Sequence, residues 1–124
     1  MDLSRKKLMT SLRHLWRERR RLLQRLTREK ELALGTVSTV YAKCGKPNCR
    51  CAQGKGHPQV QFLFYGPDGR RRCKRIRQKD AERWLQAGKR YGELKDDLHQ
   101  LRTLNLKENQ ILTALMKSQG IYYE

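Results

Sequence analysis

Three of the four cysteines in this sequence lie within eight positions of one another, and a histidine follows them. The segment YAKCGKPNCRCAQGKGHP places Cys44, Cys49, Cys51 and His57 at intervals of four, one and five residues. Thiolate and imidazole groups are the usual ligands of tetrahedral Zn²⁺, and four of them complete its coordination. The glycines and prolines between these residues favour tight turns. The spacing therefore predicts a zinc site that staples the loop.

The fourth ligand of this site has two candidates. His57 closes the loop locally, whereas Cys73 falls on a predicted strand and could pair there with Phe62 in a hairpin core. We favour His57 on this ground. An iron–sulfur cluster that uses Cys73 as its fourth thiolate is the alternative metal centre, since plant-type ferredoxins have similarly short cysteine spacings.

Roles without a metal fit these thiols less well. Free cysteines are commonly buried as small apolar groups, but this segment is polar and rich in lysine. A catalytic cysteine needs a base and an orienting carboxylate, and Asp68 is the sole carboxylate between Gly35 and Gln78. We therefore expect no catalytic residues, and a protein that is not an enzyme.

The chain is strongly basic, which predicts a polyanionic partner. Its 124 residues include 29 Lys and Arg against 12 Asp and Glu, a net charge of +17. Residues 1–34 hold 11 basic and 4 acidic groups (+7), residues 35–78 hold 10 and 1 (+9), and residues 79–124 hold 8 and 7 (+1). A basic surface is the electrostatic footprint of a nucleic-acid-binding protein. The first two segments are therefore expected to contact DNA or RNA.

Residues 1–34 are predicted to form a basic helix that ends near Gly35. Leucines recur there at alternating four- and three-residue steps, with Arg19 in one place of the series: Leu8, Leu12, Leu15, Leu22 and Leu26. This period is typical of an amphipathic helix. Its other face carries arginines, whose guanidinium groups suit phosphate; a merely solvated face is the alternative. They are Arg13, Arg17, Arg20, Arg21, Arg25 and Arg28.

Residues 35–78 are predicted to contain the zinc-binding loop and a basic β-hairpin. Val60, Phe62 and Phe64 alternate with Gln61, Leu63 and Tyr65, the turn GPDG follows, and a second strand is rich in arginine. Phe62 and Phe64 are expected in the core, and Tyr41 and Tyr65 at the contact surface. The basic residues expected to bind nucleic acid are Lys43, Lys46, Arg50 and Lys55 in the loop and Arg70, Arg71, Arg72, Lys74, Arg75 and Arg77 on the strand.

Residues 79–124 are predicted to form a long helix that begins at Asp80. Its apolar positions follow two heptad series: Trp84, Tyr91, Leu98, Asn105 and Leu112, and Ala87, Leu94, Leu101, Glu108 and Leu115. A single helix cannot bury such a stripe. Its partners are the first helix folded back as an antiparallel arm and residues 80–118 of a second copy, which need not exclude each other, and we expect a homo-oligomer through this helix. Asn105 and Glu108 make the seam locally polar; a helix break at 103–107 is the alternative.

The expected fold is therefore α+β: a long N-terminal helix, a zinc-stapled loop with a β-hairpin, and a long C-terminal helix in an antiparallel or dimeric coiled coil. No segment has the length of a membrane span, and the start lacks the apolar centre of a signal peptide. We expect a cytoplasmic protein whose thiols stay reduced.

Residues 35 to about 85 also resemble a known family. The run GTVSTVYAKCGKPNCRCAQGKGHP, followed by QFLFYGPDGRRRCKRI, is similar to short, uncharacterised bacterial proteins found near transposase genes and other mobile elements. The resemblance implies that Cys44, Cys49, Cys51 and His57 occupy metal-ligand-like positions. The sequence departs from the family pattern at Pro58-Gln59, where Gly-Pro is usual, and at Cys73, which leaves the fourth ligand open.

These observations predict a non-enzymatic, zinc-stapled protein that binds DNA or structured RNA. The resemblance suggests an accessory factor of a mobile element or of a larger nucleoprotein complex, with a larger protein such as a transposase as partner. A coiled-coil adaptor without a specific nucleic-acid role is the alternative. A nuclease is a third and weaker hypothesis, since Glu93, Asp96, Asp97 and His99 lie close in sequence. Helical spacing, however, spreads these four residues over different faces of the helix.

Overall fold

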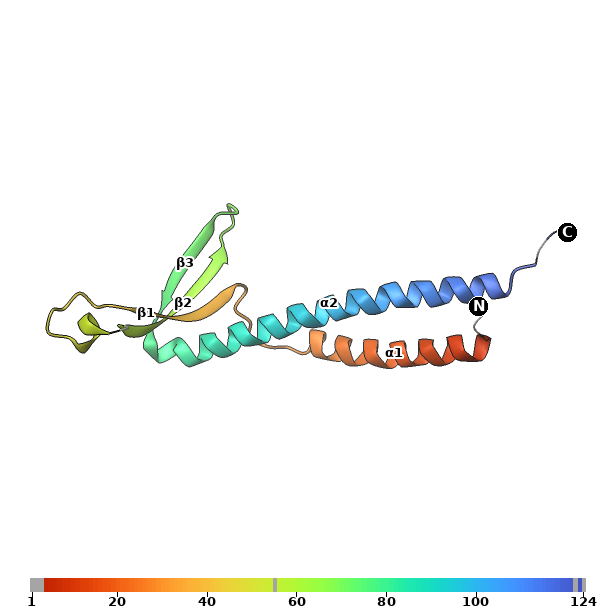
Figure 1. The fold of residues 1–124 in the computed structure, drawn as a ribbon, viewed down its shortest axis with the longest axis horizontal. Coiled ribbons are helices and arrows are strands. Elements are labelled where there is room, and N and C mark those ends of the chain that lie inside the picture. Colours follow the sequence, from red (N-terminus) through yellow and green to blue (C-terminus); the bar gives the residue numbers. More distant parts are fainter. Residues whose placement is uncertain (1–3, 55, 122, 124) are drawn as a thin grey trace. The chain divides into compact units, whose positions relative to one another are not determined.

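The computed structural model describes residues 4–54, 56–121 and 123, apart from the side chains of Cys51 and Ala52. The fold is α+β, as expected from the sequence (Figure 1). Its elements are α1 (Arg5–Thr27), β1 (Thr36–Ala42), η1 (Arg50–Gln53), β2 (His57–Tyr65), β3 (Arg71–Ile76), η2 (Gln78–Asp80) and α2 (Ala81–Ser118).

Contacts divide the chain into two units, which are described separately. The helical unit comprises Met1–Glu29 and Leu94–Glu124, and the sheet unit comprises Lys30–Glu93. The long helix α2 contributes to both units. In the part of the chain that the structure describes, neither α1 nor α2 contains an apolar stretch long enough to cross a membrane.

Helix α1 is shorter than the sequence predicts. It begins after the cap Ser4, whose hydroxyl accepts a hydrogen bond from the Lys7 N–H, and it ends at Thr27 rather than near Gly35. The following residues are held in a non-helical path by the sheet unit. The Ala33 N–H donates to the Ala87 carbonyl at 3.2 Å, and Ala33 is buried. Tertiary contacts have therefore overridden a helix-favouring local sequence.

Glu31 adds a second restraint to this segment. Its carboxylate accepts hydrogen bonds from Arg83 Nε and Nη2 at 2.7 and 2.6 Å. These hydrogen bonds from the Arg83 guanidinium lower the pKa of Glu31 below its ordinary value. The segment between α1 and β1 is thus attached to the first turns of α2 by both main-chain and side-chain bonds.

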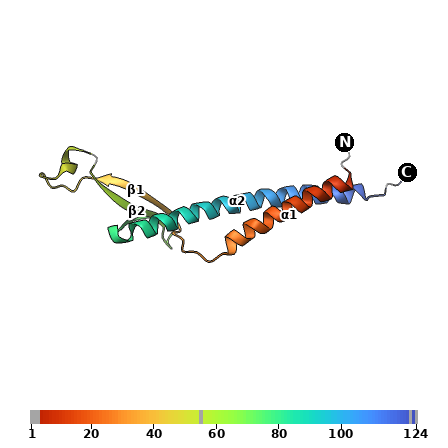
Figure 2. The same cartoon turned by 90° about the horizontal axis from the view of Figure 1, so that it is seen from below.

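In the helical unit, α1 and the C-terminal part of α2 run side by side in opposite directions (Figures 1 and 2). Leu8 and Leu12 of α1 pack against Leu115 of α2, and Met9, Ile111 and Ala114 surround them. Helix α1 is therefore one of the two partners expected for the long helix. Pairing of α2 with a second copy remains a prediction.

The side of α2 that packs on α1 contains one of the two expected heptad series, through Leu94, Leu101, Glu108 and Leu115, but not the other. Its buried and half-buried residues recur at alternating three- and four-residue steps: Leu94, Asp97, Leu101, Leu104, Glu108, Ile111 and Leu115. The expected series through Leu98, Asn105 and Leu112 was wrong, since Leu98 is 43% exposed and Leu112 38%. Arg25 binds Asp97 in the interface, so Asp97 holds the place expected for Leu98.

The polar residues of this seam have partners on α1. Arg19, which interrupts the leucine series, binds Glu108 Oε2 through Nη1 at 2.6 Å and donates from Nη2 to the Asn105 side-chain oxygen. The Trp16 indole N–H also donates to Glu108, at 3.2 Å. A shift of α1 by one heptad would leave Glu108 and Arg19 facing apolar side chains, which is costly. This cluster therefore specifies the antiparallel register. Helix α2 is continuous through it, without the break considered at 103–107.

The sheet unit contains three antiparallel strands in the order β1-β2-β3. The predicted hairpin is β2 and β3, whose turn is closed by the Gly66 N–H donating to the Arg70 carbonyl at 2.9 Å. Strand β1 was not predicted, although its sequence TVSTVYA is rich in the β-branched residues that strands favour. It pairs with β2 from Thr36↔Leu63 to Ala42↔His57.

The first turns of α2 pack on one face of this sheet. The Trp84 ring lies 5.0 Å from that of Phe62, which stacks in turn on Phe64 at 4.8 Å. Gly88 allows α2 to approach β1 closely at Val37. Because side chains alternate along a strand, Leu63 and its neighbours in register occupy the opposite face of the sheet.

We expect alanine substitutions at two glycines of α2 to change stability in opposite directions. A β-carbon at Gly88 would lie 2.8 Å from Cβ and Cγ2 of Val37, so Gly88→Ala should destabilise the sheet unit by about 1–3 kcal/mol. Within the described chain, a β-carbon at Gly92 would meet no atom within 4 Å outside the helix's own backbone. Gly92→Ala should therefore add about 0.8–1 kcal/mol. Urea unfolding of both variants measures the two effects, and stabilisation by both would contradict the packing of α2 on β1.

Candidate metal centre

The loop between β1 and β2 brings together Cys44, Cys49 and His57. The two sulfurs and a ring nitrogen of His57 all lie within 4.8 Å of one another. Cys49 Sγ is 3.1 Å from His57 Nε2. The strands explain this convergence, because Ala42 pairs with His57 and the two ends of the loop therefore meet. Cys44 follows β1 by two residues, and His57 is the first residue of β2.

Two glycines give this loop its shape. Gly45 has φ 79° and Gly56 has φ 93°, conformations that residues with a side chain rarely adopt. A β-carbon at Gly56 would also lie 2.6 Å from the Ala42 carbonyl oxygen. Between the glycines, the Cys49 N–H donates to the Lys46 carbonyl at 3.2 Å, which turns Cys49 back toward the start of the loop.

The cluster is compact enough to bind one metal ion. Bonds of about 2.0–2.3 Å to a tetrahedral ion separate its sulfur and nitrogen ligands by roughly 3.5–3.8 Å. The observed separations, from 3.1 Å between Cys49 and His57 up to 4.8 Å, bracket that range. Only small side-chain rotations would therefore seat an ion among the three ligands.

The remaining two cysteines are placed differently. Cys51 belongs to η1, and its side chain lies outside the described part of the structure. Cys73 is a free, exposed thiol on β3, and its partner in the register is Leu63. The expected pairing with Phe62 in the core was therefore wrong by one residue, which reverses the face of the sheet. Among the described residues, the ligand cluster does not include Cys73.

Exposed basic residues surround the cluster. Lys43, Lys46 and Arg50 of the loop are exposed, whereas Lys55 lies outside the described residues. They can offset the negative charge of a site that contains several thiolates.

The arginines of α1 fall into two groups. Arg13, Arg17, Arg20 and Arg28 are exposed, and Arg21 lies 3.8 Å from Glu18. Arg25 differs, because its Nε donates to Asp97 Oδ2 at 3.1 Å and its Nη2 to Oδ1. Its guanidinium thus binds a carboxylate that is only 6% exposed, while a role of Arg25 in nucleic-acid binding stays a prediction. Asp97, one of the residues considered for a nuclease, takes part in this ion pair.

The arginines of β3 are divided between the two faces of the sheet. In the register, Arg72 pairs with Phe64 and Lys74 pairs with Phe62, so these two basic side chains lie on the same face as the phenylalanines. Arg71 and Arg75 lie on the other face. Arg72 Nη2 donates to Asp68 at 3.2 Å, and Arg70 Nε is 4.0 Å from the same carboxylate. Arg75 Nε donates to Gln59 Oε1 at 2.9 Å. The strand is therefore not a single basic surface.

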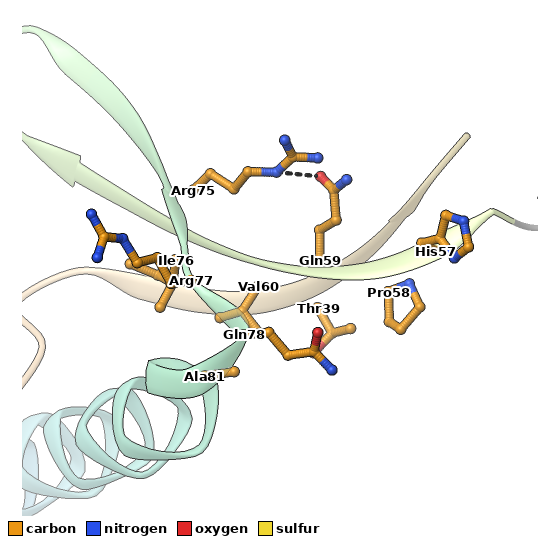
Figure 3. Close-up of a pocket in the computed structure, with 10 residues that line it drawn as sticks. All are labelled: Thr39, His57, Pro58, Gln59, Val60, Arg75, Ile76, Arg77, Gln78 and Ala81. Atoms are coloured by element: carbon orange, nitrogen blue, oxygen red, sulfur yellow. Dashed lines mark hydrogen bonds between the residues drawn. The ribbon is translucent and has the colours of Figure 1, made fainter. Parts of the chain in front are cut away.

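A pocket of about 590 Å³ adjoins the metal cluster at His57 (Figure 3). It includes three polar residues that sequence reasoning missed: Thr39, Gln59 and Gln78. Thr39 could have been found only by recognising β1, and the two glutamines carry no local signal. They come together because β1, β2 and the start of α2 meet there.

Comparison with known proteins places the chain in a family without assigning its activity. No curated protein and no solved structure matches it significantly. A family profile, described as "Domain of unknown function (DUF6788)", matches residues 13–87. This range contains most of α1, all three strands and the Cys44, Cys49 and His57 cluster. Since the match covers more than half of the 124 residues, the protein belongs to the DUF6788 family.

Proposed function

We propose that this protein is a non-enzymatic nucleic-acid-binding protein whose β1–β2 loop is held by a zinc ion. The observation that carries the proposal is the convergence of Cys44, Cys49 and His57 in a loop with exposed basic residues. Such an ion would make a short, glycine-rich loop rigid. Lys46 and Arg50 would then be presented to phosphate in a defined arrangement.

Zinc is the metal that this donor set favours. Sites with both thiolate and imidazole ligands are typical of structural Zn²⁺, whereas most iron–sulfur clusters are held by thiolates alone. We propose that Cys51 completes the set of Cys44, Cys49 and His57, because only Arg50 separates it from Cys49. In the reducing cytoplasm, where we expect the protein to act, these thiols remain available to a metal.

The distribution of charge supports nucleic acid as the partner. Arg13, Arg17 and Arg20 are exposed and follow a four- and three-residue spacing, so they share one face of α1. In the sheet unit, the exposed Lys43, Lys46 and Arg50 of the loop would supply further phosphate contacts. The family resemblance of the motif suggests a mobile-element accessory factor or a component of a larger nucleoprotein complex, with a transposase as a possible protein partner.

A coiled-coil adaptor is the second candidate. It is favoured by large apolar side chains that remain exposed on the two helices of the helical unit: Trp16, Leu23, Leu98 and Leu112. Residues 80–118 of a second copy, or a larger protein, could cover them. In this case binding to nucleic acid would be incidental.

Salt dependence distinguishes the two candidates. We expect binding to DNA or RNA that weakens steeply between about 50 and 200 mM salt, with a slope of about −0.7 to −0.9 per phosphate contact. Replacing Arg13, Arg17 and Arg20 by glutamine should reduce the magnitude of that slope by about two to three. Filter binding or fluorescence anisotropy measures it.

A matched control uses basic residues of the nearly neutral segment. Arg102→Gln with Lys107→Gln also removes exposed charges from a helix, but should leave the salt slope almost unchanged. Failure of the wild-type protein to bind any nucleic acid at low salt would reject the proposal and favour the adaptor.

A further inference from the structure

The pocket beside His57 is formed where the sheet narrows. Strand β3 pairs with β2 only as far as Ile76↔Val60, whereas β1 continues along β2 to Ala42↔His57. In the described sheet, residues 57–59 of β2 therefore have a strand on one edge only. After Ile76 the chain turns through η2 into α2, and Gln78 and Ala81 of this turn line the pocket (Figure 3).

The walls of this pocket combine apolar, cationic and amide groups. Val60, Ile76 and Ala81 supply apolar surface, and Val60 and Ile76 are themselves buried. Gln78 and Thr39 lie on the same side of β2 as this apolar surface, and Arg77 lies next to Ile76 in the chain. Arg75 and Gln59 lie on the other side, where the Arg75 guanidinium donates to Gln59 (Figure 3).

We propose that this pocket binds one unpaired nucleotide of a single-stranded nucleic acid. Its volume of about 590 Å³ lies within the range of small-molecule sites. A base would pack against Ala81 over Val60 and Ile76 and bond through its edges to Thr39 and Gln78, as unpaired bases do in other sites. Arg77 would bind its phosphate. The inference rests on the proposed function and adds its ligand class.

A peptide strand fits this pocket less well than a nucleotide. Strand addition needs a row of free backbone donors and acceptors. Only residues 57–59 of β2 extend beyond the pairing with β3, and η2 follows directly after β3. Its middle residue, Pro58, has no N–H to donate. A base pair within a duplex cannot enter either, because its bases remain stacked and paired.

The pocket also connects base recognition to the metal cluster. His57 lines the pocket, and its Nε2 is 3.1 Å from Cys49 Sγ. An ion bound to Cys49 and His57 would therefore fix one wall of the pocket. This arrangement allows a structural metal to influence the choice between single strands and duplexes.

The test compares a short oligonucleotide of mixed sequence, as DNA and as RNA, with the duplex of the same sequence at constant salt. The single strand should bind more tightly than the duplex. Arg77→Gln combined with Gln78→Ala should weaken its binding about 10- to 150-fold, as expected when a hydrogen bond to a charged group is lost. Arg70→Gln is the control, since it removes an exposed charge at the β2–β3 turn, away from the pocket-lining residues.

A second variant tests the pocket without a change of charge. Ala81→Phe fills the space over Val60 and Ile76, and should abolish the rise in fluorescence that follows when a 2-aminopurine of the oligonucleotide leaves its stacked neighbours and enters the pocket. Zinc content and circular dichroism identify variants that have failed to fold, and in that case Gln78→Ala alone replaces them. Equal affinity for single strand and duplex, or pocket variants that match Arg70→Gln, would overturn the inference while the proposed function stands. No binding to any nucleic acid overturns both.

Discussion

Replacing Cys49 by serine is expected to lower bound zinc from about one ion per chain to nearly none. Cys49 Sγ lies 3.1 Å from His57 Nε2, and a neutral hydroxyl is a far weaker zinc ligand than a thiolate. Structural zinc contributes about 10–16 kcal/mol in small zinc-dependent domains, so its loss should disorder the β1–β2 loop. The packing of Leu8 and Leu12 against Leu115 does not involve this loop, so helicity should largely persist.

Elemental analysis of the purified protein measures the metal, and limited proteolysis detects opening of the loop. Cys73→Ser is the matched control, because Cys73 is exposed on β3 and lies outside the ligand cluster. It should retain the zinc. Retention by Cys49→Ser together with loss in Cys73→Ser would contradict the proposed ligand set, and bound iron with visible absorbance would indicate an iron–sulfur cluster instead.

The second large effect is expected in the helical unit. Arg25→Ala removes the partner of Asp97, whose carboxylate is buried between the helices. Removing one member of a fully buried ion pair costs about 3–5 kcal/mol. Because the Arg25 side chain is 45% exposed, water can partly replace it, and we expect a loss of about 2–3 kcal/mol. Urea unfolding followed by helical circular dichroism gives this value.

Two further variants show whether the loss comes from the uncompensated charge. Arg21→Ala removes an exposed arginine of the same helix. Because Arg21 lies 3.8 Å from the Glu18 carboxylate, its loss should lower the free energy of unfolding by less than about 1 kcal/mol. Replacing both Arg25 and Asp97 by leucine should restore much of the stability, since an apolar pair can substitute for a buried ion pair. Equal effects of Arg25→Ala and Arg21→Ala would show that Asp97 is adequately solvated without its partner.

The acidic residues of α2 thus explain part of the charge distribution. Residues 79–124 are nearly neutral because acidic and basic groups balance there. Asp97 and Glu108 bind Arg25 and Arg19 of α1. These two arginines pair with carboxylates of α2, whereas Arg13, Arg17 and Arg20 are exposed. Arginines of one helix therefore differ in their surroundings, and only the exposed ones are left for the polyanionic ligand that we propose.

Local patterns in the sequence determined the elements that depend on near neighbours. The long C-terminal helix was predicted to begin at Asp80 and does so within one residue, since its helix-forming residues act within a few positions of one another. The GPDG turn between β2 and β3 is equally local. Cys44, Cys49 and His57 converge because fourteen positions span them and turns separate them. Short spacing made these three ligands predictable.

Features that depend on distant residues were decided by the tertiary structure alone. Strand β1 is defined by pairing with β2 across the metal loop, and α1 ends at Thr27 because Ala33 bonds to Ala87. Of the two heptad series on α2, the one through Leu94 and Leu115 is buried, and the Arg25–Asp97 pair takes the place expected for Leu98 of the other. Periodicity shows that a helix has an apolar side and cannot identify what covers it. Hydrogen bonds and ion pairs between residues far apart in sequence make that choice.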